Sequence, residues 1–462
     1  MIKNLLPLCM LLLLFVSNSI GQTPPSTEWS DNASTDWYDN LTTEFTISTA
    51  EDLAGLAELV AGGNDFTGKT ILIGANIDLA AHLWSPIGTE IGLAFSGTFD
   101  GNEFEISNLF IVTPGGDLTG LFGRCSNANL SNIHLVDPYV RTNDTAGSLV
   151  GSFSMNSNMV NCHAKGVDMV ATEYNIGGLV GELLDNSNMT RCSSLGSVTG
   201  MNQVGGLLGT PYNLTSVTEC YSEGTVNAQY LAGGLIGFST FAFTANRENT
   251  VNNCYSRANV AVVNGRAGGL VGGTDGQMII ENSYATGTAT GPEYDGGFIG
   301  ALGSVETTNN YWDTVSSVHS NAIGGFTAAS QTVDITGKTS AEMQASAMVD
   351  LLNQNQVTTP WTIDAALNDG YPILADNIAS ISDVHNSNID VSVYPTLFST
   401  FINIESDQVL SSYSLMDISG KIVRQGKLSN QSIKLETESI ISGTYILIVR
   451  SNDLSFVQKV IK

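Results

Sequence analysis

The sequence predicts an all-β protein: a right-handed β-solenoid with short helical caps, followed by a C-terminal immunoglobulin-like β-sandwich. Three observations support this prediction. A glycine-rich motif recurs seven times, with its closing glycines 28 to 35 residues apart. A pair of apolar positions recurs with it inside each repeat. The last stretch alternates apolar and polar residues with period two, which is typical of antiparallel strands.

Composition and charge exclude several classes of partner. Charged residues make up 13% of the 462 residues, and 17 Lys and Arg face 44 Asp and Glu, for a formal charge of −27. Nucleic acids and anionic membrane surfaces are disfavoured, because cationic side chains bind both. Residues 389–462 hold seven acidic and seven basic residues, so the excess acidity belongs to the rest of the chain.

The first 21 residues are predicted to be a secretory signal peptide. Lys3 gives a positive start, Leu5 to Val16 form an apolar run, and small residues precede a cleavage site between Gly21 and Gln22. The alternative is a membrane anchor, but the apolar run is shorter than the roughly 20 residues that span a bilayer. We therefore expect an exported chain that does not span the membrane, beginning with a spacer over residues 22–43.

Residues 44–118 are predicted to form an N-terminal cap and the first coils. Leu53, Leu56 and Val60 have helical spacing, Ser48 and Glu51 form a capping box before them, and glycines follow at 62 and 63. A helix at this position would cover an open sheet edge, which otherwise recruits other strands.

Residues 119–326 form the repeat array. A unit of about 28 residues with apolar pairs and turn glycines cannot bury its own apolar face, whereas stacked units bury a continuous core. One repeat per coil would place coils about 4.8 Å apart, the spacing of neighbouring strands. The motif copies end at Gly123, Gly151, Gly181, Gly209, Gly237, Gly272 and Gly300.

Two ladders run through the array, and the sequence leaves open which of them faces inward. The first ladder contains Cys162, Cys192, Cys220 and Cys254; with Cys125, five cysteines remain after signal removal, which argues against a disulfide framework. The second ladder follows it by one residue and is aromatic at its end. A turn at the preceding asparagine (Asn161, Asn253, Asn282 or Asn310) would direct cysteine inward and tyrosine outward. Buried cysteines are favoured, since free thiols are usually buried.

A C-terminal cap is expected over residues 327–375, and a linker over 376–388. A short helix should begin near Thr339, with Glu342 three residues later, and carry Met343, Met348, Leu351 and Leu352. Residues 389–462 alternate apolar and polar residues around turn glycines, which predicts the small antiparallel sandwich.

Two resemblances cover nearly the whole mature chain. The array, with GGLVG at 177–181 and GGLLG at 205–209, resembles the GLUG-motif family of secreted bacterial proteins, which includes adhesin-like members. The tail, with VYPTLF, YSLMDISGKIVRQG, SGTYILIV and KVIK, resembles the type A C-terminal sorting domain of the type IX secretion system of Bacteroidota. The alternative interpretation of the tail is an ordinary accessory β-sandwich with no role in export. Thr396-Leu397 replaces the family's usual Asn-Pro. The matching motif residues are Tyr394, Pro395, Phe398, Asp417, Gly420, Gly443, Tyr445, Lys459 and Lys462.

The resemblances imply recognition by the export machinery and delivery outside the cell or to the outer-membrane surface. No zinc-protease, nucleophile-elbow or phosphate-loop motif is present, and carboxylates do not recur at one repeat position. We therefore expect no enzyme activity and no cofactor. His134 and His163 are interpreted as ladder residues in preference to a metal pair. The segments 76–78 and 100–103 are interpreted as Asx-turns in preference to calcium sites.

The candidate binding site is an aromatic stripe formed by Tyr221, Tyr255, Tyr284 and Trp312. If these rings face outward, sugars or a protein groove could stack on them; the alternative is that they pack inside or under a loop. The predicted function is an adhesin-like binding module with an unidentified glycan or host-matrix ligand. The competing hypotheses are a carbohydrate-active β-helix enzyme and a purely structural surface protein.

Overall fold

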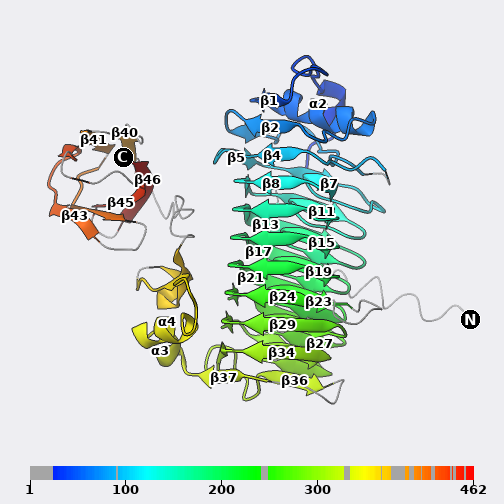
Figure 1. Cartoon of the computed structure of the whole chain (residues 1–462), viewed down its shortest axis with the longest axis vertical. Coiled ribbons are helices and arrows are strands. Elements are labelled where there is room, and N and C mark those ends of the chain that lie inside the picture. The colour runs from blue at the N-terminus through cyan, green and yellow to red at the C-terminus, as the bar shows by residue number, and fades with distance from the viewer. Residues whose placement is uncertain are drawn as a thin grey trace, which may run out of the picture.

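The computed structural model describes residues 24–89, 92–240, 248–326, 333–365, 367–375, 391–394, 400–406, 408–417, 422–437, 440, 444–451 and 454–462. It confirms the predicted fold class: a parallel β-solenoid, followed by antiparallel sheets at the C-terminus (Figure 1). The strand pairings between coils are parallel, with a register shift between Lys165 and Val167, and the first sheet has 10 strands. In the described part of the chain, no helix is both long and apolar enough to cross a membrane.

The first two sheets form the long walls of the solenoid. In spatial order, the first sheet contains β1 (Glu44–Ile47), β2 (Thr70–Ile73), β4 (Thr98–Asp100), β8 (Asn129–Ser131), β12 (Asn158–Val160), β16 (Asn188–Thr190), β20 (Ser216–Thr218), β24 (Asn249–Asn252), β29 (Gln277–Glu281) and β34 (Ser304–Thr308). The second contains β3 (Ile77–Asp78), β5 (Glu105–Ser107), β9 (His134–Val136), β13 (His163–Ala171), β17 (Ser193–Gly200), β21 (Tyr221–Ala228), β25 (Tyr255–Ser256), β30 (Tyr284–Ala285), β35 (Asn310–Asp313) and β37 (Ile335–Lys338), extended laterally by β6 (Phe110–Val112), β10 (Tyr139–Thr142), β26 (Asn259–Val262) and β31 (Ala289–Thr290).

Two further sheets are joined by the glycine motif. The third contains β7 (Phe122–Ser126), β11 (Val150–Ser154), β15 (Val180–Leu184), β19 (Leu208–Tyr212), β23 (Ile236–Ser239), β28 (Val271–Thr274), β33 (Ile299–Leu302) and β36 (Ile323–Phe326). The fourth contains β14 (Ile176–Gly177), β18 (Val204–Gly205), β22 (Leu231–Gly233), β27 (Arg266–Gly268) and β32 (Tyr294–Gly296).

The motif glycines allow the third and fourth sheets to touch backbone to backbone. A Cβ on Gly209 in β19 would lie 2.6 Å from the backbone nitrogen of Ile176 in β14 and 2.6 Å from the carbonyl oxygen of Gly181. A Cβ on Gly205 would lie 2.0 Å from the carbonyl oxygen of Leu208. Contacts this short with backbone atoms exclude any side chain. The recurring glycines therefore mark a tight reversal of the chain in each coil.

The N-terminal cap contains the predicted helix. In α2 (Ala50–Ala61), Leu53, Leu56 and Val60 are fully buried. The capping prediction was one residue early: Thr49 is the N-cap, and its side chain accepts from the backbone N–H of Asp52 at 3.2 Å. A short 3-10 helix, η2 (Trp29–Asn32), packs beside α2.

The C-terminal cap packs on a side of the solenoid. The predicted capping box forms between Thr339 and Glu342, but the expected single helix divides into α3 (Ser340–Met343) and α4 (Ser346–Leu352). The cap continues through β38 (Trp361–Thr362), η3 (Asn368–Gly370) and β39 (Ile373–Leu374). Its buried side chains form one apolar cluster with the outer face of the second sheet, and Figure 1 places α3 and α4 beside the lower coils.

The C-terminal region forms the predicted antiparallel sandwich. One sheet contains β40 (Val391–Tyr394), β41 (Phe401–Ser406) and β44 (Ser432–Glu436). The other contains β43 (Ile422–Lys427), β42 (Ser412–Asp417), β45 (Thr444–Ser451) and β46 (Leu454–Ile461). Ile402 and Ile404 on β41 share a buried core with Leu415 on β42 and Leu447 on β45.

Candidate functional site

The cysteine ladder faces inward, as favoured from the sequence. All five described cysteines are free and buried. The backbone N–H of Cys192 points to the Sγ of Cys220 at 3.3 Å, and that of Cys220 points to the Sγ of Cys254 at 3.4 Å. The predicted turn residues Asn161, Asn253 and Asn282 have positive φ. This turn interrupts the alternation of the strand, so that the cysteine after it and the apolar residue three positions earlier both point inward, as Cys162 and Met159 do.

The aromatic ladder lies on the outer face of the second sheet, but its last member differs from the prediction. The strand register pairs Tyr284 with Tyr311 and places Trp312 beside Ala285. Trp312 belongs to the solenoid core cluster. The last coil is one residue shorter than the common spacing, and its left-handed turn residue is Asn309, where Asn310 was predicted. The outer ladder is therefore Tyr221, Tyr255, Tyr284 and Tyr311.

The C-terminal cap covers the tyrosine ladder, so the rings are packed under another segment, which is the alternative to the exposed binding stripe. The rings of Tyr221 and Tyr255 stack at 4.7 Å, and those of Tyr255 and Tyr284 at 5.0 Å. Trp361 of the cap lies 5.5 Å from the Tyr284 ring. Tyr255 is 3% exposed and Tyr284 is fully buried. Rings at these positions hold the cap on the solenoid and are not accessible to a ligand.

Polar contacts surround this aromatic contact. The Tyr284 hydroxyl donates to the Pro372 carbonyl oxygen at 2.6 Å, and the Tyr371 hydroxyl donates to Asp313 Oδ2 at 2.7 Å. The Arg257 guanidinium binds Asp369 and donates to Asn368 Oδ1 at 2.6 Å. Burial raises the pKa of Tyr221 to about 12 and raises that of Tyr284 strongly, so these hydroxyls stay protonated.

The Asp313 carboxylate gives cap docking a predicted pH dependence. Burial, the largest influence, raises its pKa, but hydrogen bonds from the Ser316 backbone and the Tyr371 hydroxyl outweigh it and hold the pKa below its usual value. A depressed carboxyl pKa stabilises the folded state above the unfolded-state pKa of about 3.9, and this contribution is lost as pH falls through the lower folded pKa. We expect proteolysis within residues 340–374 to rise below about pH 4.

The matched variant for this pH prediction is Asp313→Asn, in which the acid-induced opening should be much smaller. The pKa of the Glu223 carboxyl is raised, because burial outweighs the lowering effect of Arg257. Its protonation therefore changes stability with pH in the opposite direction to that of Asp313, and Glu223→Gln controls for this contribution. The same pH profile for wild type and Asp313→Asn would contradict the assignment.

The two histidines and the acidic turns have structural partners. His134 and His163 lie 5.4 Å apart between ring centres, and burial, with a smaller effect of His134, lowers the pKa of His163 to about 3. Asp100 Oδ1 accepts from the Asn102 backbone and from Asn132, and Asp78 Oδ1 accepts from the Ala80 backbone. Among the described residues, no group of three or more His, Cys, Asp or Glu side chains has the arrangement of a metal site.

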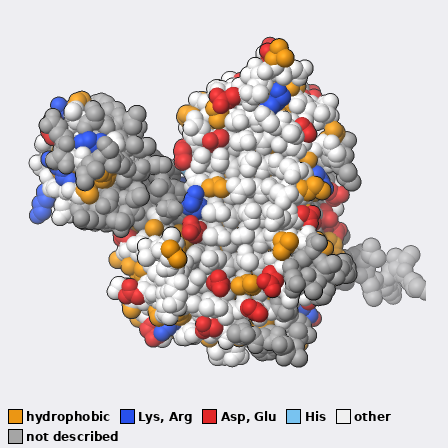
Figure 2. Space-filling model, in the orientation of Figure 1, with side chains coloured by type: hydrophobic (Ala, Val, Ile, Leu, Met, Phe, Trp, Pro, Cys, Tyr) orange, Lys and Arg blue, Asp and Glu red, His pale blue; other side chains and the backbone are white. Residues whose placement is uncertain are grey.

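The outer face of the first sheet carries a neutral polar column that the sequence reasoning missed. Its members occupy one register position in seven successive coils. They are Thr70, Thr98, Asn129, Asn158, Asn188, Ser216 and Thr250. All are at least partly exposed, and none is charged although the chain carries −27. Figure 2 shows a broad pale band over the upper and middle coils, with acidic side chains mostly at its margins. The alternation of Asn-Met-Thr at 188–190 and Ser-Val-Thr at 216–218 could have revealed this column.

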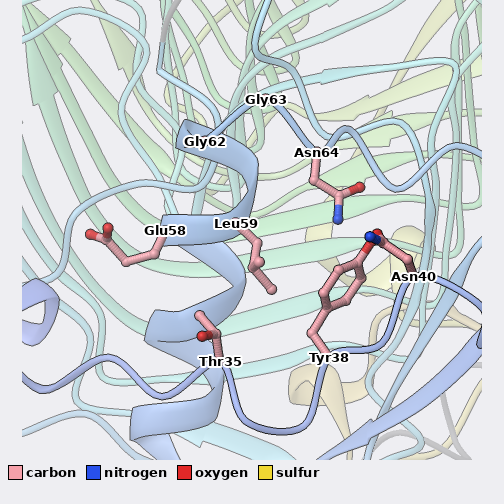
Figure 3. A pocket seen from close by; sticks show the side chains of 8 residues that line it. All are labelled: Thr35, Tyr38, Asn40, Glu58, Leu59, Gly62, Gly63 and Asn64. Atoms are coloured by element: carbon pink, nitrogen blue, oxygen red, sulfur yellow. The ribbon is translucent and has the colours of Figure 1, made fainter.

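A hollow of about 490 Å³ lies on the N-terminal cap (Figure 3). We call it the tip hollow; it is lined by Thr35, Tyr38, Asn40, Glu58, Leu59, Gly62, Gly63 and Asn64. The Tyr38 hydroxyl donates to Asn40 Oδ1 at 2.7 Å, and Asn64 Oδ1 accepts from the Phe66 backbone at 3.3 Å. In Figure 3, Tyr38, Asn40 and Asn64 lie together beside the helix, and Glu58 extends from its other side.

Only part of the predicted sorting-domain motif can be located. Tyr394 lies on β40, Asp417 on β42 and Lys459 on β46. Tyr445 on β45 is buried, and the Lys462 ammonium donates to the Thr437 carbonyl oxygen. The remaining motif positions and the cleavage site lie outside the described residues: Gly21, Gln22, Pro395, Phe398, Gly420 and Gly443.

Comparison with protein families assigns both parts of the chain. Residues 392–462 match the family model of the secretion system C-terminal sorting domain. Residues 172–199, 202–227 and 263–290 match the GLUG motif. No curated protein matches the sequence. The chain is therefore a GLUG-motif repeat protein with a type IX sorting domain, which directs its export to the cell surface or the extracellular space.

Proposed function

We propose that the exported solenoid is an adhesin-like binding module without catalytic activity of its own. The sorting domain brings the chain outside the cell. A solenoid in which each coil is hydrogen-bonded to the next is rigid along its axis and presents long, continuous faces. Such a scaffold suits attachment to extended ligands.

The neutral polar column on the first sheet is the main support for a binding function. Across seven coils at about 4.8 Å each, it offers a run of hydroxyl and amide groups about 29 Å long between the first and last members. An uncharged strip on a strongly acidic molecule avoids repelling a neutral partner, and amides and hydroxyls both donate and accept hydrogen bonds. Many weak contacts along one extended ligand would act together and raise its avidity.

Binding of the mature chain to arrays of glycans and matrix proteins tests the proposal. The double variant Asn158→Asp/Asn188→Asp places two charges in the middle of the column and should weaken binding to retained ligands at least about tenfold, or 1.4 kcal/mol. Asn227→Asp adds one such charge on β21, on another sheet, and should bind like wild type; the single variant Asn158→Asp is its matched partner and should bind more weakly. Retention of no array member, or equal binding by the double variant, would contradict the proposal.

The proposed lack of catalytic activity is tested with polysaccharide substrates. The mature chain is incubated with neutral and acidic polysaccharides, and new reducing ends or unsaturated products are measured over time. We expect no release above a heat-denatured sample. Turnover that follows the purified protein would favour the enzyme hypothesis.

A further inference from the structure

We propose that the tip hollow binds a single neutral sugar unit, such as the end of a glycan chain. This would be a second binding site, at the N-terminal end of the rod and separate from the neutral polar column. Its volume of about 490 Å³ lies within the range of small-molecule sites. The inference rests on the proposed function only in placing a ligand outside the cell.

The side chains of the hollow combine the two features that a sugar requires. A pyranose has hydroxyl groups at its rim and apolar C–H groups on its faces. The half-buried Tyr38 and Leu59 give the hollow an apolar side. Asn40, Asn64 and Thr35 give it polar groups at the rim.

The two amides are held so that their donors remain available. The acceptor oxygen of Asn40 is occupied by the Tyr38 hydroxyl at 2.7 Å, and that of Asn64 by the Phe66 backbone N–H at 3.3 Å. These bonds fix which side of each amide carries the NH₂ group. Within the described residues, neither NH₂ group has a hydrogen-bond acceptor. Two oriented donors at the rim of a hollow match the oxygen atoms of sugar hydroxyls.

Charge selects a neutral sugar over an acidic one. The lining residues include one ionisable carboxyl, Glu58, and no basic side chain. Lys69 is not among the lining residues, and its Nζ donates to the carbonyl oxygens of Asn40 at 3.2 Å and Thr42 at 2.8 Å. It also lies 5.5 Å from the centre of the Tyr38 ring. The lining therefore offers no basic side chain to pair with the carboxylate of a uronic or sialic acid, and the chain as a whole carries −27.

The hollow lies at one end of the solenoid. It is formed on α2, at the N-terminal end of the stacked coils (Figure 1). The other cap packs on the outer face of the second sheet, beside the lower coils in Figure 1. The hollow is therefore separate from the tyrosine ladder that the C-terminal cap covers.

Saturation-transfer NMR on the mature chain tests the inference. The probes are the methyl glycosides of glucose, galactose, mannose and N-acetylglucosamine, with glucuronic acid as the anionic arm. At least one neutral probe should receive saturation, and glucuronic acid should not. Asn40→Ala and Asn64→Ala should each reduce the signal at least fivefold. Asn227→Ala, on β21, removes an amide far along the chain and should leave it unchanged.

The outcomes separate this site from the proposed function. Thermal melting of each variant checks that the cap is folded. Asn40→Ala is the decisive variant, because the described side-chain contact of Asn40 is with the Tyr38 hydroxyl and not with the backbone, so its loss should disturb the fold little. No transfer to any neutral probe, equal transfer in Asn40→Ala, or stronger transfer to glucuronic acid overturns the inference. Array binding that persists in that case leaves the polar column as the binding site.

Discussion

Replacing Gly209 by alanine is expected to destabilise the solenoid by about 3 kcal/mol, the upper part of the range for overpacked sites. The added methyl carbon would lie 2.6 Å from three backbone atoms, which belong to Asn175, Ile176 and Gly181 of the preceding coil. Backbone atoms cannot move aside as the end of a flexible side chain can. Because each coil is stabilised by its neighbours, the damage should spread along the array.

Urea denaturation measures this effect, and Gly62→Ala is the matched control. Gly62 follows α2 with φ −75°, and an added Cβ would lie 3.3 Å from the nearest backbone oxygen. Its replacement should change stability by less than about 1 kcal/mol. If Gly209→Ala and Gly62→Ala unfold at the same urea concentration, the backbone contact between the third and fourth sheets is not what the motif glycines provide.

Replacing Tyr284 by alanine should release the C-terminal cap, at a cost of about 3 to 5 kcal/mol. The ring is fully buried between Tyr255 and Trp361, and its hydroxyl holds the Pro372 carbonyl. Its loss removes the centre of the contact between cap and solenoid. Limited proteolysis should then cut residues 340–374 at least tenfold faster, while the coils before β21 stay resistant.

Two variants define the origin of that effect. Tyr284→Phe keeps the stack and loses the hydroxyl bonds, so it should cost about 1 to 2 kcal/mol. Tyr230→Ala removes a ring that is 42% exposed and should leave the cap closed. Equal cleavage of the cap in Tyr284→Ala and Tyr230→Ala would mean that the tyrosine ladder does not hold the cap.

The repeat pattern predicts the solenoid because the physical requirements repeat with it. Each coil needs small residues at the sheet reversal, apolar residues inside and a left-handed residue before the inward cysteine. Asn161, Asn253 and Asn282 meet the last requirement in the structure, so the inward cysteines follow from the sequence. At the last coil, one fewer residue shifts Trp312 out of the aromatic ladder, and spacing alone does not reveal such a deletion.

The sequence left open whether the aromatic stripe is exposed or covered, and it did not identify the segment that covers it. The contact joins Tyr284 to Pro372 and Arg257 to Asp369, which lie 88 and 112 residues apart in the chain. Local periodicity carries no information about such a distant contact. The same limit applies to the tip hollow, which forms where the segment of Tyr38 meets the end of α2. The alternating polar positions of the first sheet are visible in the sequence, but Asn, Ser and Thr at such positions are also ordinary on the outer face of any strand.

If the chain is an exported binding module, living cells that display it should adhere to surfaces coated with its ligand. Cells of a type IX-competent host expressing the full chain are compared with cells expressing residues 1–391, which lack the matched sorting domain. Retention is counted on surfaces coated with mucin, collagen, cellulose or chitin. We expect at least tenfold more retained cells on one or more surfaces for the full chain, and background retention for the shortened chain. Equal retention of both strains on every surface would contradict the proposed function.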